Sequence, residues 1–436
     1  MKLKPTPAAL SGLLALVLAA CTQEVPTDIG GSLLPSGGVR TFEVILEPEQ
    51  FLVFDTAFSG YADAFDARFL VIARDFEGVL DANTLIRFGQ KPVSIQVRDS
   101  AGAVRTDTLP KFAGGDLVIR IDTLRSRGAA EVSVYFTTEP WDASSATWTT
   151  RIDTGSVTLP WQTPGGTRGA RIGSVPWTAG EDTLIIALDS ATVFALTNVA
   201  DTTRGTVFTI DNTSVPAGAQ LRIAGASLRL PARSTLRPDT TVQVNVEPIS
   251  TTFIFTPDPP LLGTTPRVSG VPAWRTVLSV IDGLEDLMLP CPDGTAGCTF
   301  RLGDATLNLA DLLLRPTGSP PGFSPEDSIR VQAHPLLVLQ NVPLSRSPVG
   351  VAVGGSRDAI PRTRFSNADN GPEAAVSVTQ LIGPVLADTT SPGSAQRPSR
   401  FIALLTNPET FSFGFGTFRE GPRLRLILTV QSEERE

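Results

Sequence analysis

The apolar positions of this chain come in short runs, and a turn-forming residue interrupts them about every eight to twelve positions. Val132, Val134 and Phe136 alternate with other residues, so they would share one face of an extended strand. Val, Ile, Thr and Phe are frequent in these runs, as is typical of strands. Strands are predicted over 41–46, 50–54, 69–73, 94–98, 116–121, 131–136, 183–188, 206–210 and 220–230. The pattern indicates an all-β protein, with short helices expected only near 279–289 and 304–314.

The second half of the chain resembles the first. Residues 44–54 read VILEPEQFLVF and residues 244–255 read VNVEPISTTFIF, while AQLRI at 219–223 aligns loosely with PRLRL at 422–426. We therefore predict two tandem antiparallel β-sandwiches of jelly-roll character, over 41–232 and 240–432. The boundary would lie in the polar, proline-containing stretch 231–239. The alternative is chance similarity, because β-rich halves share a limited vocabulary of strands.

The start of the chain has the features of a lipoprotein export signal. Lys2 and Lys4 supply positive charge, and the apolar stretch 8–18 is too short to span a bilayer. The sequence LAAC at 18–21 then matches the lipobox. Residues 1–20 are therefore predicted to be a lipoprotein signal peptide, and Cys21 to carry acyl chains such as palmitate. The alternative is an ordinary secretory signal that leaves Cys21 as a bystander.

The sequence after the signal predicts where the protein lies. Thr22 follows the cysteine, and in Gram-negative sorting an Asp at this place favours retention in the inner membrane, so the outer membrane is the expected address. Residues 21–40 combine the acylated Cys21 with a stretch rich in Gly, Pro and Ser, which indicates a flexible tether. We expect a lipid-anchored cell-envelope protein on the periplasmic or the surface-exposed face of that membrane.

Charge and cysteine content narrow the possible partners. The net charge is −8, and removal of Lys2 and Lys4 with the signal takes it to about −10. Since basic residues are not clustered, nucleic acid is not an expected partner. Cys291 and Cys298 flank an Asp-Gly turn, so a disulfide between them is predicted in an oxidising compartment. A metal site is the alternative, but two thiols without a nearby His are too few for zinc, and neither a metal nor another cofactor is expected.

Four of the five tryptophans lie between Trp141 and Trp177. Within this stretch a strand is followed by a Trp, an acidic residue, a Ser pair, a Thr-Trp and a Pro-Gly-Gly turn. The residues of this pattern are Trp141, Asp142, Ser144, Ser145, Thr147, Trp148, Pro164, Gly165 and Gly166. The pattern resembles the DNRLRE-domain family, a group of β-sandwich modules on bacterial and archaeal surface proteins.

Other parts of the chain add to this resemblance. TLIRF at 84–88 and TFREGPRL at 417–424 are similar to the early and closing strands of the DNRLRE-domain family, although Gly89 stands where that family usually has Asp. The segment DIGGSLLP at 28–35 is similar to uncharacterised lipoproteins of Gram-negative bacteria. Because some relatives are carbohydrate-binding modules, the resemblance implies a β-sandwich with a possible glycan ligand.

The tryptophans have two alternative roles, packing and sugar binding. Trp141 and Trp148 occupy motif positions, together with Asp142 and Thr147, and the two tryptophans are predicted to pack where the sheets meet. Trp161 and Trp177 flank Gly- and Pro-rich turns, so these two are predicted to be exposed and to bind a ligand. In the alternative, the tryptophans all plug the sandwich core, and each indole N–H is bonded to a nearby carbonyl.

Catalytic constellations are absent from the sequence. His334 is the single histidine, which leaves little room for a Ser-His-Asp triad, and its place before a proline predicts the end of a strand. Neither a nucleophile-elbow motif nor a phosphate-binding loop is present. Paired carboxylates could serve a glycosidase, and the candidates considered are Glu47, Glu49, Asp63, Asp66 and Glu139.

The sequence therefore predicts a non-enzymatic lipoprotein with a binding, adhesion or envelope-scaffolding role. Its expected partners are the membrane, through the lipid anchor, and polysaccharide or envelope proteins. One alternative is a carbohydrate-active enzyme that uses two carboxylates. Another is an accessory subunit of an outer-membrane transport or secretion complex, which an exposed apolar patch would favour.

Overall fold

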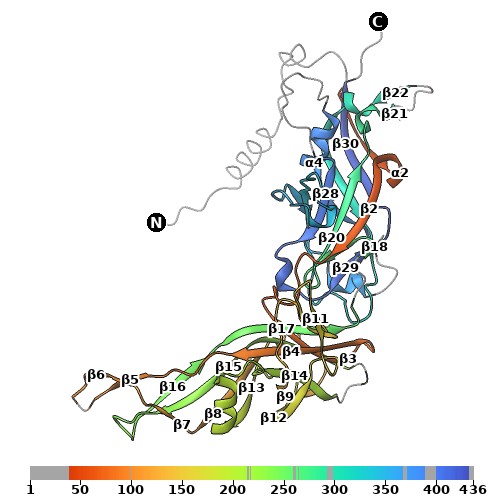
Figure 1. Ribbon diagram of the computed structural model, residues 1–436. Coiled ribbons are helices and arrows are strands. Elements are labelled where there is room, and N and C mark those ends of the chain that lie inside the picture. Colours follow the sequence, from red (N-terminus) through yellow and green to blue (C-terminus); the bar gives the residue numbers. More distant parts are fainter. Residues whose placement is uncertain are drawn as a thin grey trace, which may run out of the picture.

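The computed structural model describes residues 39–99, 101–213, 216, 218–258, 262–263, 265–291, 298–366, 371–387 and 399–431. The chain forms two β-rich bodies that meet at an angle (Figure 1). Strands hold 51% of the residues and helices 10%, and the ladders between the named strands are antiparallel. The prediction of an all-β sandwich fold is therefore confirmed. Among the helices of the described residues, none is long and apolar enough to cross a bilayer.

The lower body in Figure 1 contains an 11-stranded sheet. Its main path runs β12-β9-β14-β4-β3-β15-β8-β13, while β7 and β16 pair with β15 and β17 pairs with β4. The strands are β3 (Leu70–Phe76), β4 (Leu80–Phe88), β7 (Lys111–Phe112), β8 (Gly114–Ile121), β9 (Ala130–Thr137), β12 (Arg168–Trp177), β13 (Thr183–Asp189), β14 (Thr206–Thr213), β15 (Ala219–Arg233), β16 (Thr241–Val246) and β17 (Pro248–Thr256). The small elements of this body are the hairpins β5 (Ile95–Arg98)–β6 (Val104–Asp107) and β10 (Thr150–Asp153)–β11 (Thr158–Pro160), and α3 (Ser190–Thr197).

The upper body contains a 13-stranded sheet. Its strands are β1 (Val39–Leu46), β2 (Leu52–Ser59), β18 (Leu262–Gly263), β19 (Arg267–Ser269), β20 (Trp274–Val280), β23 (Thr306–Leu314), β24 (Pro316–Thr317), β25 (Val331–Pro335), β26 (Gly354–Ser356), β27 (Ala374–Ser377), β28 (Phe401–Thr406), β29 (Phe415–Phe418) and β30 (Arg423–Gln431). The small elements are the hairpin β21 (Met288–Pro290)–β22 (Thr299–Arg301), the helices α2 (Pro48–Phe51) and α4 (Thr379–Leu386), and the short 3-10 turns η1 (Leu284–Asp286), η2 (Leu302–Asp304), η3 (Leu344–Arg346), η4 (Arg362–Phe365) and η5 (Glu409–Phe411).

Alternating burial explains why these segments form strands. In β13, Leu184, Ile186 and Leu188 are buried and the residues between them are exposed, which is the period of a strand. The helix predicted near 304–314 is wrong, because residues 306–314 form β23 between β27 and β30. A central strand is buried on both faces, so its apolar run cannot be told from a helix by periodicity.

The sheets divide the chain differently from the predicted ranges 41–232 and 240–432. The first strands, β1 and β2, pair with β30 and β20 of the upper body. In turn, β16 and β17 pair with β15 and β4 of the lower body. The predicted boundary at 231–239 lies inside the β15–β16 hairpin, so it is not a linker between bodies.

The first two strands of each half thus belong to the sheet of the other half. The two pairs are also placed alike: β1 and β16 each lie beside the last strand of the opposite half, β30 or β15. Sequence periodicity predicts that a segment is a strand, but the choice of partner depends on contacts far along the chain. The exchange was therefore invisible in the sequence.

A single apolar core continues from the lower body across the junction. Phe253 of β17 has its ring centroid 5.9 Å from that of Phe413, and Phe255 lies 6.1 Å from Phe323. Phe413 and Phe323 come from the upper body, and both are almost completely buried. A second core fills the upper body between β23, β28 and β30. Because aromatic residues bury large apolar areas, this packing couples the two bodies mechanically.

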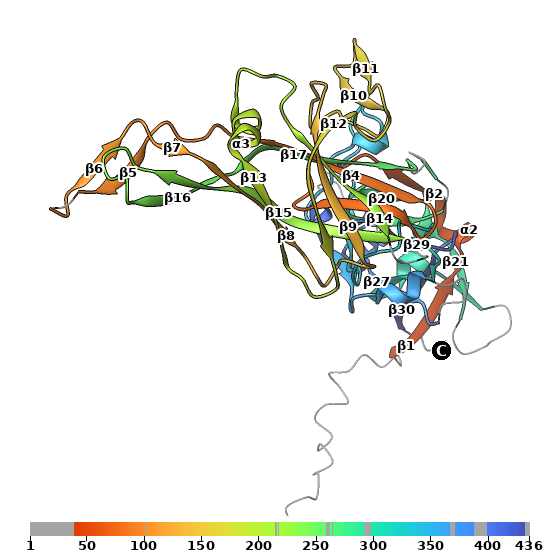
Figure 2. The ribbon, with the colours of Figure 1, turned by 90° about the horizontal axis from the view of Figure 1, so that it is seen from below.

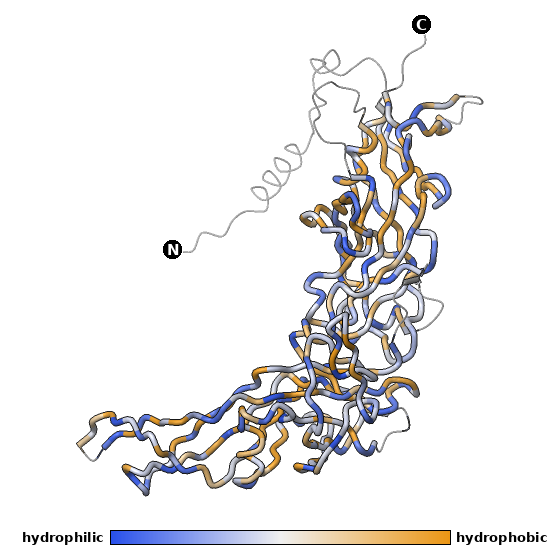
Figure 3. The backbone as a smooth tube through the Cα atoms, in the orientation of Figure 1, coloured by the Kyte–Doolittle hydropathy of each residue, from blue (hydrophilic) through white to orange (hydrophobic). Residues whose placement is uncertain are grey.

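A narrow arm extends from the lower body, as the view from below shows (Figure 2). It consists of β5, β6, β7, β16 and the end of β15, held by a small core around Ile95, Val97 and Ala232. The hydropathy tube in Figure 3 shows apolar and polar positions alternating along the strands of the arm. Asp107 ends β6 and accepts hydrogen bonds from Ser234 Oγ at 2.8 Å and Thr235 Oγ1 at 2.8 Å, both in the turn between β15 and β16.

Candidate binding groove at the junction

The tryptophan stretch forms a small core on one face of the lower sheet. Trp141 and Trp161 are buried there against Leu85, Val207 and Ile254. Ile254 lies between Phe253 and Phe255 in β17, so alternate side chains of this strand serve two different cores. Trp141 packs, as expected for a motif position. The exposed ligand-binding role expected for Trp161 is wrong, because its ring is only 4% exposed and its Nε1 donates to Thr147 O at 3.0 Å.

Trp177 is also buried rather than exposed. It ends β12, belongs to the main core of the lower body and is 1% exposed. Its Nε1 donates to Glu181 O at 2.8 Å across a turn. Of the Gly and Pro residues that suggested a loop, Gly180 lies in the turn after this ring, whereas Gly173 and Pro176 belong to β12, and the ring is part of a core built from strands distant in sequence. The expected surface role of Trp177 is therefore corrected to packing.

Asp142 and Thr147 shape the loop that carries the motif. The Asp142 carboxylate accepts from Ser144 N at 3.0 Å and from Ser145 Oγ at 3.2 Å. These hydrogen bonds, the Ser144 hydroxyl foremost, hold the pKa of Asp142 below its usual range. Thr147 Oγ1 accepts from Thr150 N at 3.1 Å and closes the turn before β10. Both residues therefore have local structural roles.

Trp148 is half-buried and lines a groove instead of being enclosed between the sheets as predicted, and it rests on the Pro-Gly-Gly turn of the motif. Gly165 N donates to Trp148 O at 2.7 Å, and Asn83 Nδ2 donates to Gly165 O at 2.7 Å. Gly165 has φ +86°, and a Cβ there would lie 2.9 Å from the Trp148 ring. Only glycine allows both the backbone conformation and the close approach of the ring. The turn thus supports one part of the indole while the rest remains accessible.

Trp148 lines an open groove of about 720 Å³ where the two bodies meet. One wall comes from residues 59–65 after β2, another from 143–155 around β10, and the floor from β17. Phe65 also lines the groove, with 50% of its surface exposed. The volume is in the range of sites that hold small ligands or a short segment of a polymer.

Carboxylates and hydroxyls complete the lining. Asp63, Asp153 and Asp258 contribute carboxylates, whereas none of the described residues that line the groove is Lys or Arg. Partial burial raises the pKa of Asp63, where the charge of Asp66 adds to the effect, and it also raises the pKa of Asp258. The groove therefore presents hydrogen-bond acceptors beside two aromatic surfaces and carries no positive charge.

The remaining sequence candidates lie elsewhere. Glu47 is near Arg423 and Glu49 near Glu373, in a charged hollow of the upper body. Glu139 is buried and bonded to Gln162 N at 3.1 Å and to Arg151. Of the five carboxylates considered for hydrolysis, Asp63 alone lines the groove.

His334 and the cysteines have structural roles. His334 lies in β25, with Nδ1 2.8 Å from Gly350 O and Nε2 3.3 Å from Gln332 Oε1. The predicted disulfide between Cys291 and Cys298 is confirmed. Among the described residues, no group of three or more His, Cys, Asp or Glu side chains is arranged to hold a metal ion. Cys21 lies outside the described residues.

Sequence reasoning missed Phe65, Asp258 and the groove itself. Phe65 lies in the segment YADAFD at 61–66, outside any predicted strand. An aromatic residue in a polar loop is the one signal that pointed to it. Asp258 has no such signal, because only the strand exchange brings the end of β17 to the loop after β2.

Comparisons with known proteins identify no relative: no family model, no curated protein and no solved structure matches the chain. The similarity of the tryptophan stretch to the DNRLRE-domain family therefore stays a prediction. The function has to be argued from the groove and from the sequence itself.

Proposed function

We propose that this chain is a non-catalytic envelope lipoprotein whose junction groove binds a neutral polysaccharide. The observation that carries the proposal is the placing of Phe65 and Trp148 in one open groove with three carboxylates. The apolar C–H face of a sugar ring packs against an aromatic plane, and sugar hydroxyls donate to carboxylates. A groove without Lys or Arg favours neutral over acidic sugars, because its carboxylates repel an anion.

The groove is open at the surface, which suits a chain polymer better than an enclosed cavity does. Its walls come from both bodies, and the aromatic core beneath them holds these walls in place. A site formed in advance loses less entropy on binding than one that must order itself. The proposal therefore places adhesion or polysaccharide capture at the junction.

The anchor is the second part of the proposal. The LAAC sequence at 18–21 supports acylation of Cys21, and several acyl chains hold a protein stably at a membrane. The first described strand, β1, begins opposite the end of β30, at the end of the upper body away from the lower body (Figure 1). On this proposal the upper body lies nearer the outer membrane, and the groove and arm lie farther out.

Binding is tested with arrays and calorimetry using neutral glucan, galactan, xylan and mannan fragments. We expect at least one class to bind, and Phe65→Ala and Trp148→Ala to weaken binding by about tenfold or more, equivalent to roughly 1.4 kcal/mol. Phe194→Ala is the matched control, because Phe194 is 59% exposed on α3 and does not line the groove. Absence of binding to every fragment, or equal effects of the Phe65 and Phe194 variants, would contradict the proposal.

Hydrolysis is the second candidate function, and one observation favours it. Asp63 and Asp258 line the same groove and both have raised pKa values, as a general acid requires. The same fragments distinguish the two functions: release of shorter products that Asp63→Asn or Asp258→Asn abolishes would favour an enzyme. Binding without any product supports the non-catalytic proposal.

Acylation is tested by growing cells with labelled palmitate. We expect label on the wild-type protein and none on Cys21→Ser, because the thiol is the acceptor of the acyl group. The fold of the described residues does not include Cys21, so the variant should keep the same thermal unfolding. Label that persists on Cys21→Ser, or is absent from both proteins, would reject the anchor while leaving the groove proposal untouched.

A further inference from the structure

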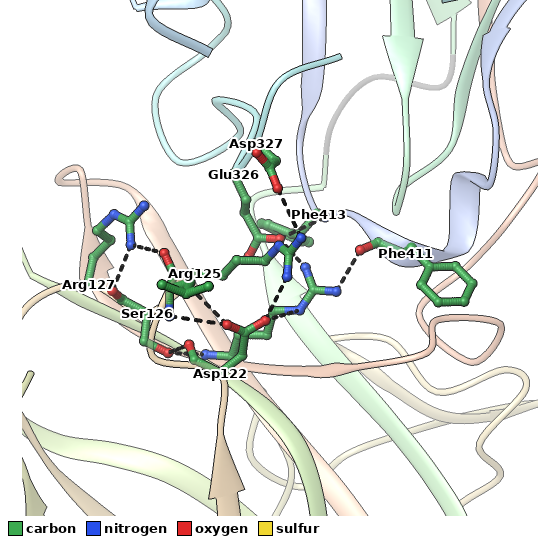
Figure 4. A network of polar contacts seen from close by, with 10 residues as sticks. Asp122, Arg125, Ser126, Arg127, Glu326, Asp327, Phe411 and Phe413 are labelled. Carbon is green, nitrogen blue, oxygen red and sulfur yellow. Dashed lines mark hydrogen bonds and ion pairs between the residues drawn. The ribbon is translucent and has the colours of Figure 1, made fainter. Parts of the chain in front are cut away.

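Two adjoining cavities, separate from the groove, lie at the junction of the two bodies. Their volumes are about 440 Å³ and 310 Å³, and both are lined by Arg125, Arg127, Glu326 and Arg362. Arg125 and Arg127 follow β8 in the lower body, whereas Glu326 and Arg362 belong to the upper body. Figure 4 shows the polar network around Arg125, Arg127 and Glu326.

Part of this network already joins the two bodies. Arg222 of β15 donates to Glu326 Oε2 and to Phe411 O, both at 2.5 Å, and its guanidinium lies 3.8 Å from the centroid of the Phe69 ring. Arg125 contacts Asp122 and Asp327, each at 2.9 Å. The charges of Arg222 and Arg125 are therefore balanced by carboxylates (Figure 4).

Arg127 and Arg362 are different, because no carboxylate of the described residues lies within 4.0 Å of either guanidinium. Arg127 Nη1 donates to Leu124 O at 2.7 Å and Ser126 O at 2.9 Å, which fixes its direction. The Arg362 side chain is exposed, and it makes no hydrogen bond within the described part of the chain. Burial and the nearby charge of Arg362 lower the pKa of Arg127, while the charges of Glu326 and Asp122 partly oppose this shift. Two like charges held near each other repel, and an anion between them removes that repulsion.

The floor of the smaller cavity has unused polar atoms. Glu326 and Gln220 both line this cavity. Their atoms Glu326 Oε1 and Gln220 Nε2 are buried and have no hydrogen-bond partner among the described residues. The Glu326 side chain is 5% exposed and Gln220 is 4% exposed. A buried polar atom without a hydrogen-bond partner destabilises the fold, so each of these two atoms indicates a hydrogen bond to a ligand or to water.

We infer that these cavities bind a monoanionic sugar acid, with its carboxylate between Arg127 and Arg362. Guanidinium groups recognise carboxylates in a planar, paired geometry. The cavities are lined by three arginines and by three carboxylates, those of Glu77, Glu326 and Asp327. Because these carboxylates repel an anion, a ligand with one negative charge is favoured over a dianion such as phosphate. The carboxylates of Asp327 and Glu77 accept hydroxyl donors, which a sugar acid supplies beside its own carboxylate.

Sugar acids occur both as free molecules and as units of acidic polysaccharides, and the test separates these sources. Calorimetry with the full chain in detergent uses sodium glucuronate, glucose, inorganic phosphate and trigalacturonate. We expect glucuronate to bind, glucose not to bind, and phosphate to bind more weakly than glucuronate. Tighter binding of trigalacturonate than of glucuronate assigns the site to a polysaccharide, and equal or weaker binding assigns it to the free acid.

Variants decide whether the arginines form the site. Arg362→Gln should weaken glucuronate binding about tenfold or more, and because Arg362 has no partner in the described residues the fold should persist. Arg233→Gln, on an exposed arginine of β15, is the matched control and should bind like the wild type. Phe65→Ala should also leave glucuronate binding unchanged, which separates this site from the groove. Absence of glucuronate binding, phosphate binding as tight as glucuronate, or equal behaviour of the two arginine variants would overturn the inference.

Discussion

Tyr61 illustrates how single side chains are held at the junction. The Arg275 guanidinium lies 3.9 Å from the centroid of the Tyr61 ring, and Arg275 forms a paired contact with Glu409 at 2.8 and 2.7 Å. Burial raises the pKa of Tyr61 to about 12, although the charge of Arg275 opposes this effect. The pKa of Tyr61 therefore indicates whether the loop after β2 remains packed against β20.

Alkaline titration of the two tyrosines tests this environment. Tyr135 donates to Asp211 Oδ2 at 2.6 Å, and this hydrogen bond to a carboxylate also raises its pKa. We expect little phenolate absorbance near pH 10. The phenolate absorbance of Tyr61, identified as the difference between the wild type and Tyr61→Phe, should appear only near pH 12. Since folding raises the pKa of Tyr61, its contribution to stability is present below about pH 10 and is lost as the pH rises towards 12. Ionisation of both tyrosines near pH 10, while circular dichroism still shows the fold, would contradict the assignment.

Residue-scale expectations from the sequence were correct where the determining contacts are local. The disulfide joins residues 7 positions apart. Trp161 and Trp177 were misplaced because the segments that bury them come from distant strands. A turn residue beside a tryptophan predicts the turn but not the exposure of the ring.

At the scale of elements, the exchange of strand pairs is the main feature of the fold. β1 and β2 complete the upper sheet, and β16 and β17 complete the lower sheet. β17 alone supplies Phe253 and Ile254, both nearly fully buried. Burying such side chains contributes roughly 1.5–3 kcal/mol each, which is a large part of the 5–15 kcal/mol that typically stabilises a domain.

Fragments of nearly equal length test the exchange. Fragment 60–258 contains every strand of the lower sheet, so we expect cooperative thermal unfolding. Fragment 41–232 lacks β16 and β17 and carries β1 and β2 without their partners, so it should be unfolded or aggregate. Mixing it with fragment 240–432 should restore a folded complex. Cooperative unfolding of fragment 41–232 alone, without its partner fragment, would show that the exchange is dispensable.

At the scale of the whole molecule, the junction is where the features that suggest function gather. The shared aromatic core and the Arg222–Glu326 contact hold the two bodies at a fixed angle. The groove and the arginine-lined cavities both take residues from each body. The groove is lined by carboxylates without Lys or Arg, whereas the cavities combine three arginines with three carboxylates, and on our proposals the two sites bind different kinds of sugar. Neither site exists in one body alone.

The sequence by itself determined the all-β class, the position of many strands and the disulfide. These properties depend on side-chain alternation, turn residues and short motifs, all of which act over a few positions. Only the tertiary structure decided which strands pair, which tryptophans are buried and where the groove lies. Strand pairing joins segments far apart in the chain, such as β1 and β30, and periodicity carries no information about the choice of partner.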